Sequence, residues 1–159
     1  MAEPEHPNAA VIDRFYRALQ DRDAAAMSAC YHPQVEFRDD AFGPLAGDDA
    51  RTMWRMLCER GEDLRVEFGD VRADDRVGSA HWEAWYTFAA TGRPVHNVID
   101  ADFEFADGLI RRHTDHFDFG RWASQALGLP GKLLGRTPPF RKAFRRRARA
   151  MLDRFAAAG

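Results

Sequence analysis

Three consecutive β-strands are predicted within residues 79–119, which read SAHWEAWYTFAATGRPVHNVIDADFEFADGLIRRHTDHFDF. The middle segment, 95–105, alternates apolar and polar side chains, as a strand with one buried face does. Residues 91–94 (TGRP) and 107–108 (DG) are turn sequences, because glycine takes positive φ freely and proline fixes its own φ. The stretch therefore predicts an antiparallel meander whose apolar face needs a cover. Its strands are expected at about 78–89, 95–105 and 109–117.

The sequence allows two alternative sets of side chains on the inner face of the last strand. Strict alternation from Ile110 places His116 and Asp118 on the inner face. A β-bulge near the hairpin would place His113 and Asp115 there instead, because one extra residue moves every later side chain to the other face.

The residues before the meander predict helices and short strands. An apolar stripe from Val11 to Leu19 predicts a first helix with Asn8 as its N-cap, and Asp23 is placed to cap a second, short helix through Tyr31. A strand at 34–38, a loop at 39–47, a helix at 48–60 and a strand at 64–71 follow. Helices followed by a run of antiparallel strands indicate the α+β class.

The length of the chain predicts one domain with a C-terminal extension. The 159 residues suffice for a single buried core, which we expect within residues 1–128. No apolar run is long enough to span a membrane, and the acidic start does not resemble a signal peptide, so a cytoplasmic protein is expected.

Residues 129–159 predict an extension that begins with a Gly- and Pro-rich loop, LPGKLLGRTPP (129–139), and continues as a basic, amphipathic helix. The segment 119–159 holds 10 Lys and Arg residues and one acidic residue, whereas the rest of the chain holds 13 basic and 24 acidic residues. We expect the apolar stripe that begins at Phe140 to dock on the acidic domain, although contact with an anionic membrane remains an alternative. Nucleic acid is not an expected partner, because the aromatic residues lie on the apolar side of this helix.

Residues 11–39, 47–57 and 90–128 together resemble the nuclear-transport-factor-2-like superfamily, and more narrowly its SnoaL-like branch. That branch includes polyketide cyclases, and ketosteroid isomerases and limonene epoxide hydrolases are relatives. The resemblance covers roughly residues 8–128. It implies a strongly curved antiparallel sheet wrapped around the N-terminal helices, which forms a cone with one deep pocket. The superfold hosts hydrolases, isomerases, cyclases and binding modules, so the site must be argued residue by residue.

Three candidate catalytic residues are proposed, two from the resemblance and one from the alternation along the last strand. Asp39 matches the general base of the isomerases, where a carboxylate abstracts a proton next to a carbonyl if apolar neighbours raise its pKa. Asp118 matches the acid–base aspartate at the end of the last strand, with a raised pKa expected there, and N-capping of the following helix is the alternative role. His116 shares the inner face with Asp118 under strict alternation.

The candidate ligand-binding residues are mostly aromatic and are expected on the inner side of the cone. They are Tyr16, Trp54, Trp82, Tyr86, Asn97 and Phe103. No metal site is expected, because the histidines of the meander scatter their donor atoms over both faces. No cofactor is expected either, since the chain has no dinucleotide-binding, Walker or nucleophile-elbow motif.

Two classes of function remain open from the sequence. The first is a cofactor-independent isomerase, cyclase or hydrolase that acts on a small, mostly apolar carbonyl compound through acid–base carboxylates. The second is a non-catalytic ligand-binding or dimerisation module of the same fold. In both cases a homodimer is expected through the outer face of the meander, where Trp85, His96 and Val98 give a mixed character.

Overall fold

The computed structural model describes residues 5–159, so the first four residues of the predicted domain 1–128 lie outside the described residues. The helices are α1 (Pro7–Gln20), α2 (Ala24–Ala29), α3 (Asp48–Arg60), α4 (Phe119–Leu127), α5 (Leu129–Leu134) and α6 (Pro138–Ala158). The strands are β1 (Tyr31–Asp39), β2 (Gly43–Ala46), β3 (Arg65–Ala73), β4 (Val77–Phe88), β5 (Arg93–Ala106) and β6 (Leu109–His116). The predicted strands of the meander are thus confirmed to within two residues at each end.

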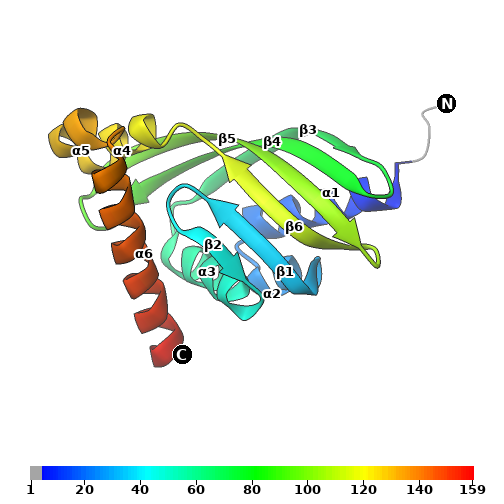
Figure 1. Ribbon diagram of the computed structural model, residues 1–159. Coiled ribbons are helices and arrows are strands. Elements are labelled where there is room, and N and C mark those ends of the chain that lie inside the picture. The colour runs from blue at the N-terminus through cyan, green and yellow to red at the C-terminus, as the bar shows by residue number, and fades with distance from the viewer. Residues whose placement is uncertain (1–4) are drawn as a thin grey trace.

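The six strands form one sheet in the order β2-β1-β6-β5-β4-β3. Figure 1 shows α1, α2 and α3 on one side of this curved, open sheet and α4, α5 and α6 gathered at one end of it. The α+β fold expected from the sequence is therefore confirmed. One detail differs, because β1 pairs with β6 in parallel and all the other pairs are antiparallel.

A β-bulge decides the register of β6. Ile110 pairs with Phe105 and Arg112 pairs with Glu104, so Arg111 is an extra residue without a partner across β5. Beyond it, Phe103 pairs with His113 and Ala101 pairs with Asp115 on the buried face. The extra residue reverses the side-chain alternation of β6. The inner face therefore carries His113 and Asp115, as a bulge predicts, and not His116 and Asp118, as strict alternation predicts.

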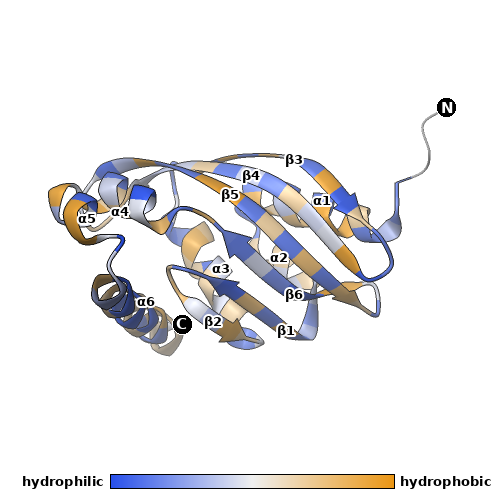
Figure 2. Ribbon diagram, turned by 45° about the horizontal axis from the view of Figure 1, so that its top comes forward, coloured by the Kyte–Doolittle hydropathy of each residue, from blue (hydrophilic) through white to orange (hydrophobic). Residues whose placement is uncertain are grey.

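The core lies between the inner face of the sheet and the N-terminal helices. Figure 2 shows the alternation of hydrophobic and hydrophilic residues along the central strands that creates this face. The predicted stripe of α1 is confirmed, since Val11, Ile12, Phe15, Tyr16 and Leu19 are all buried. The N-cap is His6 rather than Asn8: Nδ1 of His6 accepts the Asn8 amide N–H at 3.0 Å.

Two elements form where loops were predicted. β2 lies within the predicted loop 39–47, and α5 lies within the Gly- and Pro-rich segment before α6. In both cases glycine and proline indicated a break, but tertiary contacts order the segment. The short helix α2 ends at Ala29 and Tyr31 already belongs to β1, although Tyr31 was expected to end the helix.

The C-terminal helix α6 packs along one end of the domain beside α3 (Figure 1). Leu152 is buried in the main core, and the Phe144 ring lies 5.0 Å from the Trp122 ring of α4. Arg149 pairs with Asp49 of α3 at 2.8 Å. Among the described residues, no helix combines the length and the apolar character needed to cross a membrane.

Candidate functional site

A chain of hydrogen bonds runs through the otherwise apolar inner face of the sheet. Trp54 Nε1 donates to the Tyr31 hydroxyl at 2.8 Å, and that hydroxyl lies 2.8 Å from His113 Nδ1. His113 Nε2 lies 2.8 Å from Asp115 Oδ1, which also accepts from Trp82 Nε1 at 3.4 Å. All five side chains are buried. A polar chain of this kind is retained in an apolar core only when its members satisfy one another.

The direction of these hydrogen bonds follows from the donors at each end. Asp115 accepts at Oδ1, so His113 donates from Nε2, and in the neutral tautomer with this proton Nδ1 accepts from the Tyr31 hydroxyl. Burial raises the pKa of Tyr31 well above its usual value, so the phenol keeps its proton. The network therefore holds the Asp115 carboxyl group in one orientation, with Oδ2 free of hydrogen bonds from the described residues.

Asp39 lies beside Asp115 at the ends of the two parallel strands β1 and β6. The register pairs Phe37 with His113 and Arg38 with Thr114, so the next residues along the strands, Asp39 and Asp115, share the inner face. Oδ1 of Asp39 accepts the backbone N–H groups of Ala41 at 2.9 Å and Phe42 at 2.7 Å. Its Oδ2 has no hydrogen-bond partner among the described residues.

The surroundings of Asp39 favour its neutral form. The pKa of Asp39 is raised from 3.8 to about 7. Removal from water is the largest cause, the two backbone N–H donors oppose it, and the nearby Asp115 carboxylate adds to the rise. A carboxyl group with a pKa near 7 exchanges its proton at neutral pH, which is the property of a general acid–base residue. The condition stated for Asp39 from the sequence, a pKa raised by its surroundings, is thus met in this fold.

Two further side chains, Tyr16 and Tyr86, lie near the carboxyl pair, and Asn97 shares their face of the sheet. Tyr16 is fully buried, its hydroxyl has no hydrogen-bond partner among residues 5–159, and its ring lies 5.6 Å from the Trp82 ring. Burial, with a contribution from Asp115, raises the pKa of Tyr16 well above 10, so the hydroxyl remains a donor. Tyr86 and Asn97 lie on the same inner face and are half-buried. Tyr86 accepts a 2.7 Å hydrogen bond from Trp122, and burial raises the pKa of its phenol to about 12.

Asp118 and His116 do not join this cluster. Asp118 is the N-cap of α4, where it accepts from the Arg121 amide at 3.0 Å and pairs with Arg136 at 3.1 Å. These donors lower the pKa of Asp118, so the expected rise was wrong. The bulge turns His116 to the outer face, where it is exposed and bonds to Asp102.

The other predicted ligand-binding residues are brought together. Trp54, Trp82 and Phe103 are buried around the His113 ring or next to it, and the Trp54 and His113 rings stack 6.1 Å apart. Sequence reasoning missed Tyr31, which had been placed at a helix end. The available signal was the alternation of Tyr31, Val35 and Phe37, which are all buried in β1, but Pro33 interrupts it.

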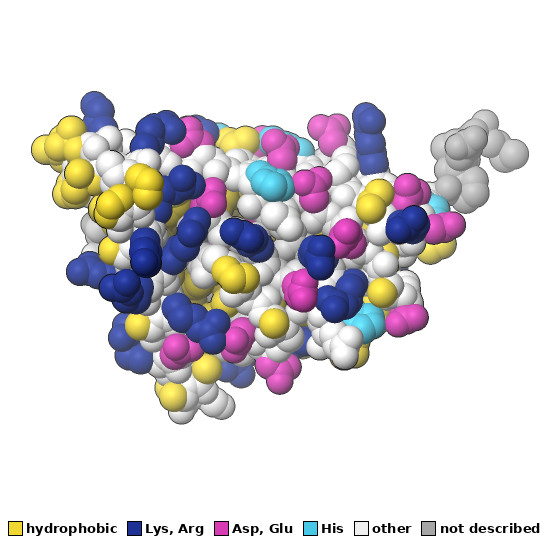
Figure 3. All heavy atoms as spheres, in the orientation of Figure 1, with side chains coloured by type: hydrophobic (Ala, Val, Ile, Leu, Met, Phe, Trp, Pro, Cys, Tyr) yellow, Lys and Arg dark blue, Asp and Glu magenta, His cyan; other side chains and the backbone are white. Residues whose placement is uncertain are grey.

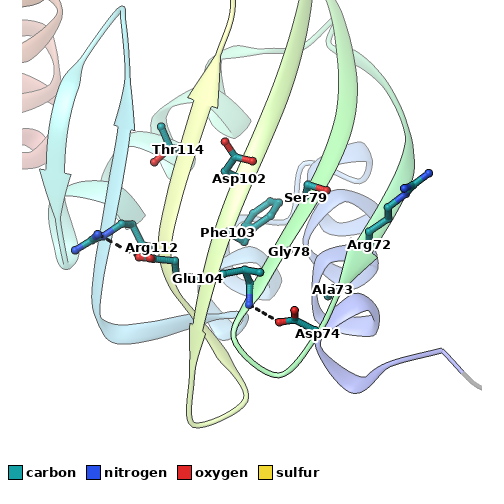
Figure 4. Close-up of a pocket in the computed structure, with 11 residues that line it drawn as sticks. Arg72, Ala73, Asp74, Gly78, Ser79, Asp102, Phe103, Glu104, Arg112 and Thr114 are labelled. Atoms are coloured by element: carbon teal, nitrogen blue, oxygen red, sulfur yellow. Dashed lines mark hydrogen bonds and ion pairs between the residues drawn. The ribbon is translucent and has the colours of Figure 1, made fainter.

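Two surface grooves lie away from the inner-face cluster of Asp39 and Asp115. The larger, of about 670 Å³, follows the outer face of β3 to β6, where Arg112 pairs with Glu104 (Figure 4). A second groove of about 530 Å³ lies between α4 and the start of the C-terminal extension and is lined by Asp118, Arg121, Lys132 and Arg136. Within the described part of the chain, no three His, Cys, Asp or Glu side chains are arranged to hold a metal ion.

Known structures share the fold. An LEH-like epoxide hydrolase from M. tuberculosis is 20% identical and superimposes with a TM-score of 0.64 over 80% of this chain and 96% of its own. A protein from Xanthomonas campestris pv. campestris assigned as a polyketide cyclase is 20% identical, with a TM-score of 0.61 over 75% of this chain and 96% of its own. AclR from Streptomyces galilaeus, assigned as a hydroxylase, is 15% identical, with a TM-score of 0.64 over 86% and 97%. At these identities the likeness shows the fold alone.

The family itself is identified by sequence. Comparison with curated proteins finds no match. The family model described as a SnoaL-like domain matches residues 12–113, which include α1 from Ile12 onward, β1 with Asp39, and β6 as far as His113. This match spans more than half of the chain and agrees with the fold, so the chain belongs to the SnoaL-like domain family.

Proposed function

We propose that the inner-face carboxyl groups of Asp39 and Asp115 form an acid–base site, and that the protein catalyses a proton transfer on a small, mostly apolar carbonyl compound without a cofactor. The observation that carries the proposal is the environment of Asp39: its pKa is about 7, its Oδ2 is unpartnered among the described residues, and it lies beside Asp115. The reaction is of the isomerase, cyclase or hydrolase type.

The proposed chemistry uses the side chains in distinct roles. Oδ2 of the ionised Asp39 takes the proton from the carbon next to the substrate carbonyl, and the electron pair of that C–H bond moves to the carbonyl oxygen. The Tyr16 hydroxyl, which lacks a partner among the described residues, donates to that oxygen. Asp39 then returns the proton to another carbon of the same molecule. The Tyr31–His113 pair holds Asp115 in place while this happens.

Substrate access is proposed at the end of the site where the side chains are half-buried. Asp39, Tyr86 and Asn97 lie there, whereas Tyr16 and His113 are fully buried behind them. Asn97 offers an amide to a polar group of the ligand, and the aromatic rings offer an apolar wall.

The proposal is tested by hydrogen–deuterium exchange at substrate carbon. The protein is incubated in D₂O with a panel of apolar ketones and lactones, and loss of the α-proton signal is followed by NMR. We expect exchange that rises with pH up to about 7 and falls at least a hundredfold in Asp39→Asn. Asp102→Asn, on the exposed outer face, is the matched control and should exchange as the parent does. Ligands that bind without exchange in the parent protein would instead support a non-catalytic binding module.

A further inference from the structure

The helix α5 exposes its large apolar side chains instead of burying them. Leu129, Leu133 and Leu134 are 66%, 68% and 49% exposed, and they make up three of the five exposed large hydrophobic residues in the described part of the chain. Pro130 beside them is exposed as well. We call this group of four residues the leucine tip. Figure 2 shows α5 as a hydrophobic element at the edge of the molecule.

Glycine, not leucine, attaches α5 to the domain. Gly131 is buried against α4, and a Cβ atom at Gly131 would collide with the Ala123 carbonyl group. A Cβ atom at Gly135 would lie 2.9 Å from the Ala123 side chain. The helix thus sits close on α4 through its backbone, and the leucines are not needed to hold it there. Apolar side chains that cluster on the surface and are not used in packing are typical of a contact surface.

Exposed cationic side chains lie on α5 itself and on the elements that precede and follow it, α4 and α6. Lys132 lies on α5 itself, and it lines the groove beside α4 together with Arg121. The first turns of α6 add the exposed Lys142, Arg146 and Arg147. None of these five side chains has an ion-pair partner within residues 5–159, in contrast to Arg149, which faces the domain. Figure 3 shows hydrophobic side chains gathered where α5 lies and Lys and Arg side chains over the adjoining α6.

The chemistry of this surface selects among possible occupants. A free anion would use the cations but not the leucines. A second copy of the chain would bring the same positive segment against itself, which repulsion disfavours. An anionic lipid bilayer uses both features, because leucines enter the boundary between headgroups and acyl chains while Lys and Arg remain among the headgroups.

We propose that the leucine tip inserts into the surface of an anionic lipid bilayer, with the exposed cations of α4, α5 and α6 against the lipid headgroups. The remainder of the chain is acidic, so only this end is attracted to such a surface. The contact is interfacial, and the domain stays on the water side. The inference is independent of the acid–base site.

Vesicle sedimentation tests this. The full-length protein is mixed with vesicles of phosphatidylcholine alone or with 30% phosphatidylserine, at low salt and at about 0.5 M salt. We expect binding to the phosphatidylserine vesicles that is at least tenfold tighter than to phosphatidylcholine and that weakens at high salt. Leu129→Ser/Leu133→Ser/Leu134→Ser should lose at least tenfold, and so should Lys142→Glu/Arg146→Glu. Val77→Ser removes another exposed apolar side chain, at the start of β4, and should bind as the parent does.

Several outcomes would overturn the proposal. The proposal is wrong if the folded parent protein does not sediment with the phosphatidylserine vesicles. Binding that depends on the cations but survives the triple serine variant would show electrostatic adsorption without insertion. A change of oligomeric state in the triple variant, measured by light scattering without lipid, would assign the leucine tip to a contact between copies. The melting temperature of each variant is measured first, so that unfolded protein is not mistaken for lost binding.

Discussion

Asp39 and Asp115 lie near the ends of two neighbouring parallel strands and face the same side of the sheet, although they are 76 positions apart in the chain. Asp115 is held at Oδ1 by His113 and Trp82, whereas Asp39 is held at Oδ1 by backbone N–H groups. Each carboxyl group therefore keeps one oxygen free of hydrogen bonds from the described residues. Burial is the main cause of the raised pKa of Asp39, and the like charge of Asp115 adds to it because it opposes simultaneous ionisation of the two groups.

The first prediction concerns the pH dependence of stability at Asp39. Its pKa is about 7 in the folded protein against an ordinary value of 3.8, so the folded state binds this proton more tightly than the unfolded state. Stability from this group is complete below about pH 4 and is lost as the pH rises through 7. Asp39→Asn removes the ionised form, and we expect it to raise the free energy of unfolding at pH 8 by a few kcal/mol, on the order of 1.4 kcal/mol for each pKa unit. Urea unfolding at pH 5 and pH 8 measures this, and an equal effect at both values would contradict it.

The second prediction contrasts two buried tyrosines. Tyr31→Phe leaves Trp54 Nε1 without its acceptor and His113 Nδ1 without its donor, so we expect a loss of about 1–3 kcal/mol. Tyr16→Phe is the matched control, because its hydroxyl has no partner among the described residues, and it should leave stability unchanged or raise it by about 1 kcal/mol. Urea unfolding at pH 7 compares the two, and equal losses would argue against the network. Tyr16→Phe should also slow the proposed proton transfer, although the protein is no less stable.

The third prediction treats Asp118 as a helix cap. Asp118→Ala removes the acceptor for the Arg121 amide and should cost about 1 kcal/mol at pH 7, whereas Asp118→Ser keeps an acceptor and should cost less. Because the folded pKa of Asp118 is lowered, its stabilising effect is present above the ordinary pKa of 3.8 and is lost as the pH falls through the folded value. The cost of the alanine variant should therefore shrink in acid. An NMR titration that gave Asp118 a pKa above 3.8 would be inconsistent with this role.

The fourth prediction concerns α6. Deletion of residues 137–159 uncovers the core around the site of Leu152 and removes Arg145 and Arg149 from Asp40 and Asp49. We expect a melting temperature lower by at least several degrees and increased binding of a hydrophobic dye. An unchanged melting temperature would show that α6 does not support the domain. Lys142→Ala, on the exposed face of the same helix, is the control for a local change that uncovers no core.

The fifth prediction concerns pairing of the chain through the outer face of β4 and β5. Trp85 lies there with its ring stacked 4.5 Å from His96 and covered by the Arg65 guanidinium at 4.0 Å. We propose that this half-buried aromatic surface joins two copies. Light scattering at micromolar concentration should give a dimer mass, and Trp85→Glu should give the mass of the monomer. A monomeric parent protein would end the proposal.

The sequence by itself determined the fold class and most of the inner face. Alternation along β5 and the apolar stripe of α1 are local patterns. Both arise because one face of the element is buried, so they can be recognised in the sequence alone. They correctly placed Phe103 inward. Asp39 was identified by resemblance, and its position at the end of β1 follows from the same alternation.

Only the tertiary structure decided which acidic residue joins Asp39. The single extra residue Arg111 reverses the faces of β6, brings His113 and Asp115 inward and leaves Asp118 to cap α4. A bulge costs little locally and is selected by packing against β5 and β1, so no short sequence pattern specifies it. The same holds for the raised pKa of Asp39, because its burial and the nearby Asp115 carboxylate of β6 both depend on the tertiary structure.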